Sequence, residues 1–332
     1  PMVMAGTSLK WSEGSSALQR FVEELAIPCF TNGMARGLLA MDHPQFFNRT
    51  RKQALADADV VVLAGTPLDF RMKFGASIPA EAQIVQLELD ETLIGQNRAA
   101  DVGLVGNLGA NLDALRETIV KRGGADFSEH SAGLRTSEDE LAEAQAAQLT
   151  SDEVPIDPLR LCKEIADAVT DDMIVIGDGG DIVAQASKVI QVPKHGAWMD
   201  PGPLGTLGVG MPFAIAAQIA HPDKRVMIVY GDGSFGLNGF EFDTAARFGL
   251  PIVGVVGNDA AWGQMMRPQS MIYGEGRLVA TELSSTRYDL VVEAMGGHGE
   301  HVTEPDGIAP AIARAFASGK PALVNVEIRQ DK

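Results

Sequence analysis

The stretch VMIVYGDGSFGLNGFEFDTAARFGLPIVGVVGNDAAWG, residues 226–263, contains the clearest structural pattern in this chain. Residues 226–230 form an apolar run of strand length, which is followed by GDGS at 231–234 and a helical pattern over 239–248. A second apolar run covers 252–256. This order predicts a strand, a glycine-rich turn, a helix and a strand, which together are the βαβ unit of a parallel sheet.

Oxygen-bearing side chains follow both predicted strands. Asp232 follows the first strand, and Asn258 and Asp259 follow the second. Ligands of open parallel sheets bind beyond the carboxyl ends of the strands, and glycines leave main-chain N–H groups open to an anion. Hard oxygen ligands beside a phosphate pocket suit Mg²⁺. The alternative for either cluster alone is an ordinary tight turn.

The same stretch resembles the thiamine diphosphate motif, in which GDG is followed further along by a closing Asn-Asn pair. It is similar to the group that includes acetolactate synthase, benzaldehyde lyase, oxalyl-CoA decarboxylase and 2-hydroxyacyl-CoA lyase. The resemblance implies thiamine diphosphate and Mg²⁺ as cofactors, with Asp232, Asp259 and the main-chain carbonyl of Ala261 as metal ligands. Asp259 stands where the family has Asn, so it adds a negative charge beside the diphosphate.

Two further stretches extend the resemblance. The segment at 200–210, DPGPLGTLGVG, is similar to a glycine-rich segment of the acetolactate synthases, in which a bulky apolar residue bends the cofactor. Leu207 stands at that position, and the carbonyl of Gly205 would accept a hydrogen bond from the aminopyrimidine. Without the match, Leu207 would be read as a core leucine. Gln264 and Met265 are candidates for substrate contact, with a surface loop as the alternative, and with Leu207 they form the catalytic set.

The cofactor-binding set that the resemblance implies extends over four segments of the second half of the chain. It consists of Gly179, Gly180, Asp181, Gly205, Thr206, Leu207, Gly231, Asp232, Gly233, Ser234, Asp259, Ala261, Trp262 and Gly263.

Composition describes an ordinary globular protein that is strongly acidic. Among 332 residues, 27 Lys and Arg oppose 44 Asp and Glu, for a net charge of −17. This balance argues against nucleic acid or an anionic membrane as a partner. No apolar run is long enough to span a bilayer, and no signal peptide is visible. Cys29 and Cys162 form no disulfide framework, so a cytoplasmic location is expected.

The chain is expected to be an α/β protein with two doubly wound parallel-sheet (Rossmann-like) domains, because strand and helix patterns alternate throughout. A central domain is predicted over 1–125, a linker over 126–155 and the diphosphate- and Mg²⁺-binding domain over 156–332. Further strands are expected at 3–5, 27–30, 59–64, 84–89, 173–176 and 322–328. Helices are expected at 14–25, 108–120, 138–148, 158–169, 288–295 and 307–318, with a loop at 128–133 and a turn at His298.

The segments at 65–71 and 86–90 resemble the central domain of the same group, which carries FAD in some relatives and ADP in others. Four basic residues near strand ends could meet the phosphates of ADP or CoA: Arg49, Arg51, Arg71 and Lys73. Solvated or salt-bridged surface is the alternative. The Met-His-Gly segment associated with the flavin-binding synthases is not evident, so FAD is less expected than ADP or CoA.

In this family a glutamate on a separate pyrimidine-binding domain activates the cofactor, and no such third domain is found here. The opening residues PMVMAG, 1–6, read as a strand entering a glycine turn. We therefore expect the pyrimidine-binding domain on another polypeptide or on an upstream segment, and a homo-oligomer, a dimer or tetramer, that shares cofactors between subunits. This chain alone is expected to be inactive, and it ends without a C-terminal lid.

The first functional hypothesis is a lyase or carboligase of the 2-hydroxyacyl-CoA lyase type, acting on an acyl-CoA and an aldehyde or ketone. It rests on the sequence NDAAWG at 258–263, on the basic residues of the central domain and on the missing flavin segment. The alternative is acetolactate synthase, which joins two 2-oxo acids. A non-catalytic nucleotide-binding protein is the third reading.

Overall fold

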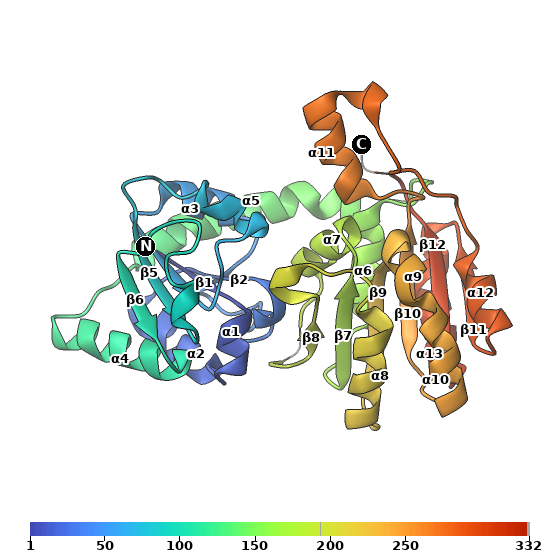
Figure 1. The fold of residues 1–332 in the computed structure, drawn as a ribbon, viewed down its shortest axis with the longest axis horizontal. Helices are drawn as coiled ribbons and strands as arrows, with labels where there is room; N and C mark the ends of the chain where they lie inside the picture. The colour runs from blue at the N-terminus through green and yellow to red at the C-terminus, as the bar shows by residue number, and fades with distance from the viewer. Residues whose placement is uncertain (193, 331–332) are drawn as a thin grey trace. The chain divides into compact units, whose positions relative to one another are not determined.

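A computed structural model describes residues 1–192 and 194–330 of the chain, which divides into two units, each with its own six-stranded sheet (Figure 1). Unit 1 contains Pro1–Ala144 and two short later segments, Val192–Trp198 and Gly202–Leu204, and unit 2 takes the rest. The two later segments lie within the range expected for the second domain, yet they cluster with the first. The α/β class with two parallel-sheet domains is confirmed.

Unit 1 has the sheet order β3-β2-β1-β4-β5-β6, and every pairing in it is parallel. Its strands are β1 (Met2–Ala5), β2 (Cys29–Thr31), β3 (Phe46–Phe47), β4 (Val60–Ala64), β5 (Gln83–Glu88) and β6 (Val102–Val105). Its helices are α1 (Thr7–Trp11), α2 (Ser15–Leu25), η1 (Gly33–Ala35), α3 (Arg51–Asp57), η2 (Phe70–Gly75), η3 (Glu91–Leu93), α4 (Leu108–Lys121) and α5 (Ser128–Leu149).

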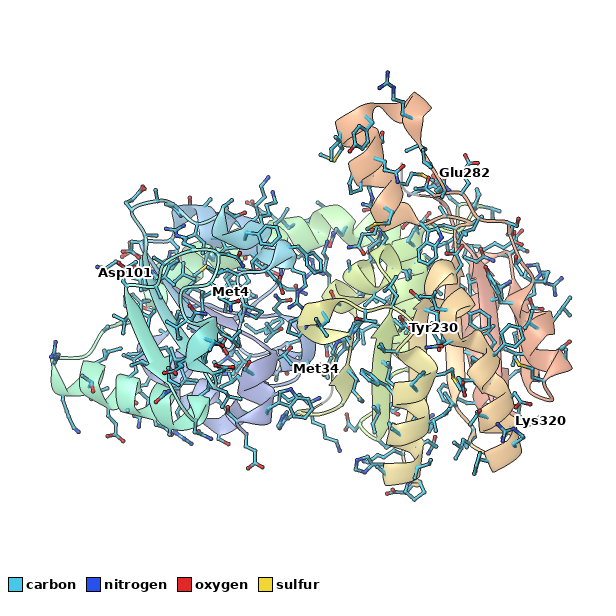
Figure 2. The ribbon with its side chains drawn as sticks, viewed as in Figure 1. Met4, Met34, Asp101, Tyr230, Glu282 and Lys320 are labelled. Carbon is cyan, nitrogen blue, oxygen red and sulfur yellow. The ribbon has the colours of Figure 1, made fainter. Side chains whose placement is uncertain are left out.

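The alternation of side chains along β1 divides the core of unit 1 into two layers. Val3 packs in the cluster that holds the inner face of α2, including Phe21. Met4, labelled in Figure 2, packs in the opposite cluster with Phe30 and Leu63. Burial of both faces explains why the strands of this unit read as nearly continuous apolar runs.

The linker is more regular than the sequence predicts. The expected loop at 128–133 is wrong, because α5 is one continuous helix from Ser128 to Leu149. Its polar, alanine-rich composition gives little apolar stripe, so periodicity could not reveal its beginning. Ser131, Leu134 and Glu138 are its buried residues, and they lie on one face.

Glu138 anchors this helix to the start of α3. Its carboxylate accepts hydrogen bonds from the main-chain N–H groups of Asn48, Arg49 and Thr50 and from the Thr50 hydroxyl, at 2.8–3.2 Å. Burial raises the pKa of Glu138, but these donors outweigh it and hold the pKa below its ordinary value. The carboxylate therefore occupies a concave arrangement of N–H groups of the kind that binds anions.

We expect Glu138→Gln to lower the free energy of unfolding by about 2–3 kcal/mol, because an amide NH₂ would face N–H donors that have lost a charged acceptor. Urea unfolding at pH 7 measures the loss. Glu140→Gln, an exposed change on the same helix, is the control and should have almost no effect. Since the folded pKa is lowered, the stabilisation is present above the ordinary pKa and is lost as the pH falls below it. If Glu138→Gln were destabilised by the same amount under acid conditions, the negative charge of Glu138 would not be the source of the stabilisation.

Unit 2 has the sheet order β11-β12-β10-β9-β7-β8, in which β11, β12, β10, β9 and β7 run parallel. Its strands are β7 (Met173–Asp178), β8 (Trp198–Met199), β9 (Arg225–Gly231), β10 (Val253–Asn258), β11 (His298–Val302) and β12 (Ala322–Glu327), of which β8 includes Trp198, a residue that clusters with unit 1. Its α-helices are α6 (Pro158–Ala168), α7 (Asp181–Val189), α8 (Gly210–Ala220), α9 (Asp232–Asn238), α10 (Phe242–Phe248), α11 (Gly263–Tyr273), α12 (Tyr288–Ala294) and α13 (Ile308–Ala317). Short 3₁₀ helices are η4 (Gly202–Leu204), η5 (Gly239–Glu241), η6 (Glu275–Arg277) and η7 (Pro305–Gly307), of which η4 clusters with unit 1.

The central strands β9 and β10 confirm the predicted βαβ unit. Tyr230, labelled in Figure 2, is fully buried at the end of β9, and its ring leaves no room for a Cβ at Gly210, where a methyl group would lie 2.6 Å away. Gly210 thus lets the first turn of α8 approach the sheet closely.

Two local expectations in unit 2 are wrong. GDGS at 231–234 is not a turn, because α9 begins directly at Asp232, at the end of the strand. His298 does not lie in a turn but begins β11, and its Nε2 lies 2.8 Å from Glu300 Oε1. His298 begins a strand because β11 pairs with β12, a contact with a distant segment that local glycine patterns do not show.

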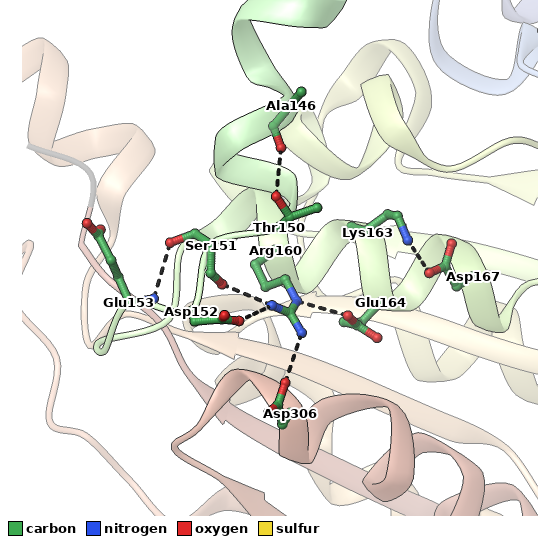
Figure 3. A network of polar contacts seen from close by, with 10 residues as sticks. All are labelled: Ala146, Thr150, Ser151, Asp152, Glu153, Arg160, Lys163, Glu164, Asp167 and Asp306. Atoms are coloured by element: carbon green, nitrogen blue, oxygen red, sulfur yellow. Dashed lines mark hydrogen bonds and ion pairs between the residues drawn. The ribbon is translucent and has the colours of Figure 1, made fainter.

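A single arginine holds the start of unit 2 together (Figure 3). Arg160 on α6 donates to the carbonyl of Ser151 and to the carboxylates of Asp152, Glu164 and Asp306. These partners join the segment that leaves α5, the helix α6 and the turn before α13.

In the part of the chain that the structure describes, no helix combines the length and apolar character needed to cross a bilayer.

Candidate active site

A cleft lies at the carboxyl ends of β7, β9 and β10, with about 630 Å³ of empty space that is partly open to solvent. These strands are neighbours, so the segments that follow them meet at one edge of the sheet. Thirteen of the predicted residues line the cleft: Gly180, Asp181, Leu207, Gly231, Asp232, Gly233, Ser234, Asp259, Ala261, Trp262, Gly263, Gln264 and Met265.

Three predicted residues are not among those that line the cleft. Gly179 packs against the Gly231 main chain, so closely that a Cβ would lie 2.8 Å from the Gly231 nitrogen. Gly205 has a φ of +62°, a conformation that favours glycine, and Thr206 is exposed. The lining residues that sequence reasoning missed are Pro158, Ile182, Gln185, Gly257, Ile328 and Arg329. Only Gly257 carried a signal, because it follows the apolar run at 252–256 and directly precedes Asn258.

Asp232 and Asp259 carry an unbalanced negative charge in this cleft. Asp232 is buried, its Oδ1 accepts from the Gly233 N–H at 2.7 Å, and its Oδ2 has no hydrogen-bond partner within the described part of the chain. Burial raises the pKa of Asp232 to about 6. Burial, and then the nearby Asp232 carboxylate, raise the pKa of Asp259 to about 7. Two desolvated carboxylates that repel each other favour a cation between them.

The donor set fits a hard divalent cation that also takes ligands from a bound molecule. Residues 1–192 and 194–330 contain no group of three or more His, Cys, Asp and Glu side chains that could hold a metal by themselves. Two carboxylates and the carbonyl of Ala261, which lines the cleft, are the available oxygens. Mg²⁺ is commonly bound in this way, by one or two carboxylates together with substrate phosphates.

Asn258, the first residue of the Asn-Asp pair, has a structural role that differs from the role of Asp259. Asn258 donates to the Thr286 carbonyl at 3.1 Å and to Asn325 Oδ1 at 3.2 Å, both away from the cleft lining. Its own Oδ1 accepts from the Ala260 N–H at 3.3 Å. Ala260 has a φ of +55°, so the chain turns sharply here and presents Asp259 and Ala261 to the cleft.

Two glycines allow the next segment to cover the cleft. A Cβ at Gly233 would lie 2.7 Å from the Trp262 ring, and one at Gly180 would lie 2.5 Å from Gln264 Oε1. The Trp262 main chain is itself fixed, since its N–H donates to the Thr281 carbonyl at 2.8 Å. Gln264 and Met265, at the start of α11, remain exposed at the cleft.

Asp178, which the sequence analysis did not select, supports the Leu207 loop. It is fully buried at the end of β7 and accepts from the N–H groups of Gly208 at 3.0 Å and Gly210 at 2.7 Å. Burial raises its pKa, and these two donors with the Ser234 hydroxyl offset the effect in part. Asp178 thereby fixes the backbone that follows Leu207.

The basic residues of unit 1 fall into two pairs. Arg49 and Arg71 are engaged, with Glu138 and Asp69 respectively. Arg51 and Lys73 have no ion pair with any described residue, and burial, with Arg71 nearby, lowers the pKa of Arg51. The alternative that these basic residues form salt bridges on the surface is thus supported for Arg49 and Arg71 only.

Two family comparisons cover most of the chain. Residues 1–115 match the family described as "Thiamine pyrophosphate enzyme, central domain", and residues 178–326 match "Thiamine pyrophosphate enzyme, C-terminal TPP binding domain". The second match contains every predicted cofactor-binding residue.

Curated relatives carry two different names. The chain is 40% identical over 326 residues to a "Probable acetolactate synthase" of Mycobacterium bovis, an alignment that covers 98% of this chain and 59% of that protein. It is 35% identical over 323 residues to "2-hydroxyacyl-CoA lyase 2" of Caenorhabditis elegans, covering 94% of this chain and 50% of that protein. The human protein of that name is 32% identical over 337 residues, covering 98% and 53%. The chain thus spans only about half to three fifths of the length of these relatives.

Proposed function

Because this chain belongs to the thiamine pyrophosphate enzyme family, we propose that it forms the diphosphate- and Mg²⁺-binding part of a C–C lyase or carboligase of the 2-hydroxyacyl-CoA lyase type. The observation that carries the proposal is the cleft of unit 2, in which the buried Asp232 has an unpartnered oxygen and lies near Asp259. A cation bound there would remove the repulsion and attract a diphosphate.

Thiamine diphosphate, when bound, supplies a nucleophilic carbon and an electron sink for breaking or making a C–C bond next to a carbonyl. The task of this chain is to bind and orient it. Asp232, Asp259 and the Ala261 carbonyl would hold Mg²⁺, and the main-chain N–H groups at 231–234 would meet the diphosphate. Leu207, held by Asp178 through Gly208, would support the bend of the cofactor.

The start of α11 would form the substrate side of the cleft. Trp262 lies against Gly233, so its ring packs on the first turn of α9, next to Asp232. Gln264 and Met265 are exposed next to it, so they are the side chains that an incoming carbonyl compound would meet. The remaining catalytic group, the activating glutamate, would come from a pyrimidine-binding domain in a homo-oligomer.

The lyase assignment is supported by unit 1. Arg51 and Lys73 have no acidic partner among the described residues, and both stand near strand ends of a Rossmann-like sheet. Such cations are suited to the phosphates of CoA or ADP, which a simple 2-oxo acid lacks. We therefore propose that unit 1 binds the nucleotide part of an acyl-CoA or a related nucleotide.

Acetolactate synthesis is the second candidate. The specific observation in its favour is the 40% identity to the "Probable acetolactate synthase" of Mycobacterium bovis, against 32–35% for the lyases. The two candidates differ in whether CoA is part of the substrate.

The test uses the complete protein with its pyrimidine-binding domain, thiamine diphosphate and Mg²⁺. We expect cleavage of a 2-hydroxyacyl-CoA into an aldehyde and formyl-CoA, measured by mass spectrometry, and no acetolactate from pyruvate. Arg51→Met should raise KM for the acyl-CoA at least tenfold with little change in kcat, whereas Arg122→Met, an exposed change after α4, should change neither. Acetolactate formation that is insensitive to Arg51→Met would favour the second candidate, and failure to bind thiamine diphosphate would overturn both.

A further inference from the structure

An ion pair at the margin of the cleft in unit 2 joins α7 and α11. Arg267 on α11 contacts the carboxylate of Asp181, the first residue of α7. Asp181 lines the cleft together with Asp232 and Asp259. We propose that Arg267 is a positioning residue that neutralises Asp181, and so allows an acidic cleft to accept the anionic diphosphate.

The charges in the cleft make this neutralisation necessary. Asp232 and Asp259 together balance one divalent cation, so Asp181 is a third carboxylate without a counter-charge from the metal. It is close to the others, since a Cβ placed on Gly263 would lie 2.5 Å from Asp181 Oδ2 and 3.4 Å from Asp259 Oδ2. A diphosphate entering beside three carboxylates would be repelled unless one of them is paired.

The geometry of α11 explains why Arg267 reaches Asp181. Gly263 and Arg267 are four residues apart on one helix, so they lie on the same face. Gly263 is buried and has no side chain, which lets this face approach the Asp181 carboxylate closely. The arginine side chain is 42% exposed and that of Asp181 is 22% exposed, so the pair lies at the margin of the cleft.

Two roles for Arg267 predict different mutant behaviour. If Arg267 binds the diphosphate directly, its loss weakens binding whatever residue stands at 181. If it acts by cancelling the charge of Asp181, removal of that charge makes the arginine unnecessary. The second role follows from the structure, because the guanidinium is already engaged by Asp181.

The experiment measures the Kd of thiamine diphosphate with saturating Mg²⁺ by titration calorimetry, in the complete protein with its pyrimidine-binding domain. We expect Arg267→Met to weaken binding about tenfold or more, and Arg267→Lys to weaken it much less, because the lysine keeps the charge. The double variant Asp181→Asn/Arg267→Met should return to within about threefold of the wild type. Arg247→Met, which breaks an exposed ion pair with Asp243 on α10, is the matched control and should not change Kd.

Ionic strength gives a second readout that a purely structural role would not change. The deficit of Arg267→Met should shrink as salt is raised, because the repulsion from Asp181 is screened. A double variant that binds as weakly as Arg267→Met would overturn the proposal, as would a loss of affinity that does not depend on salt.

The inference rests on the proposed cofactor site, and the two can be distinguished. If the wild type does not bind thiamine diphosphate, the site itself is wrong. If the wild type binds but the double variant shows no rescue, only the role of Arg267 is refuted.

Discussion

Asp232→Asn is expected to abolish Mg²⁺-dependent binding of thiamine diphosphate and, in the absence of ligands, to stabilise the protein. The loss of binding follows because an amide oxygen carries no charge, so only the Asp259 carboxylate would remain to balance a divalent cation. The gain in stability follows because Asp232 is ionised at pH 7 although burial raises its pKa to about 6. Removing a charge that is desolvated and repelled by Asp259 should contribute about 1–2 kcal/mol.

Urea unfolding of the ligand-free protein and calorimetric titration of the cofactor check the two halves of this expectation. Asp223→Asn, an exposed change in the turn after α8, is the control and should alter neither quantity. An Asp232→Asn variant that still bound the cofactor with the wild-type Kd would show that the metal site is misassigned. A variant that lost both binding and stability would show that Asp232 supports the fold rather than the ligand.

The pH dependence of the ligand-free protein provides an independent check. The folded pKa values of Asp232 and Asp259 are about 6 and about 7, both above their ordinary value of 3.8. The folded state therefore binds protons more tightly than the unfolded state, and its stability should rise as the pH falls from 7 toward 5. The pair titrates together, so the rise belongs to both carboxylates. Asp232→Asn should remove the contribution of Asp232 and reduce that of Asp259, whose burial maintains the remainder.

The strands that carry this site were predictable because burial leaves a direct mark on the sequence. Residues 226–230 and 252–256 are rich in Val and Ile, and they are central strands with both faces covered. Asp232 and Asp259 could then be placed at the same sheet edge without any tertiary information, because parallel strands end on the same side.

What the sequence could not reveal depends on partners that are distant along the chain. The start of α9 at Asp232 looked like a turn, because Gly231 and Gly233 are typical turn residues, and the close approach of Trp262 to Gly233 is not visible in the sequence. In unit 1, the start of α5 contacts a distant segment, because the Ser131 hydroxyl donates to the Ala26 carbonyl at 2.7 Å. A polar residue gives no periodic signal for such a contact.

Asp178 is the clearest example of a residue whose role depends on partners distant along the chain, Gly208 and Gly210. Its substitution is the second change for which we expect a large effect. Asp178→Ala is expected to lower the free energy of unfolding by about 2–4 kcal/mol and to weaken cofactor binding severely. The N–H groups of Gly208 and Gly210 would be left without their acceptor, and each unsatisfied buried group costs about 1–3 kcal/mol. Asp178→Asn, which keeps the size and one acceptor oxygen, should lose less.

The reason for the loss of binding is the position of Leu207 directly before Gly208. With Asp178 removed, the backbone at 208–210 has no fixed partner at the end of β7, so Leu207 no longer has a defined place in the cleft. Hydrogen exchange distinguishes a local loosening of the backbone at 208–210 from a general loss of stability. The amides of Gly208 and Gly210 should lose protection far more than those of β9. Asp171→Ala, an exposed change just before β7, should leave all of these amides protected. If Gly208 and Gly210 stayed protected in Asp178→Ala, the loop would have to be held by other contacts, and Leu207 would keep its place without Asp178.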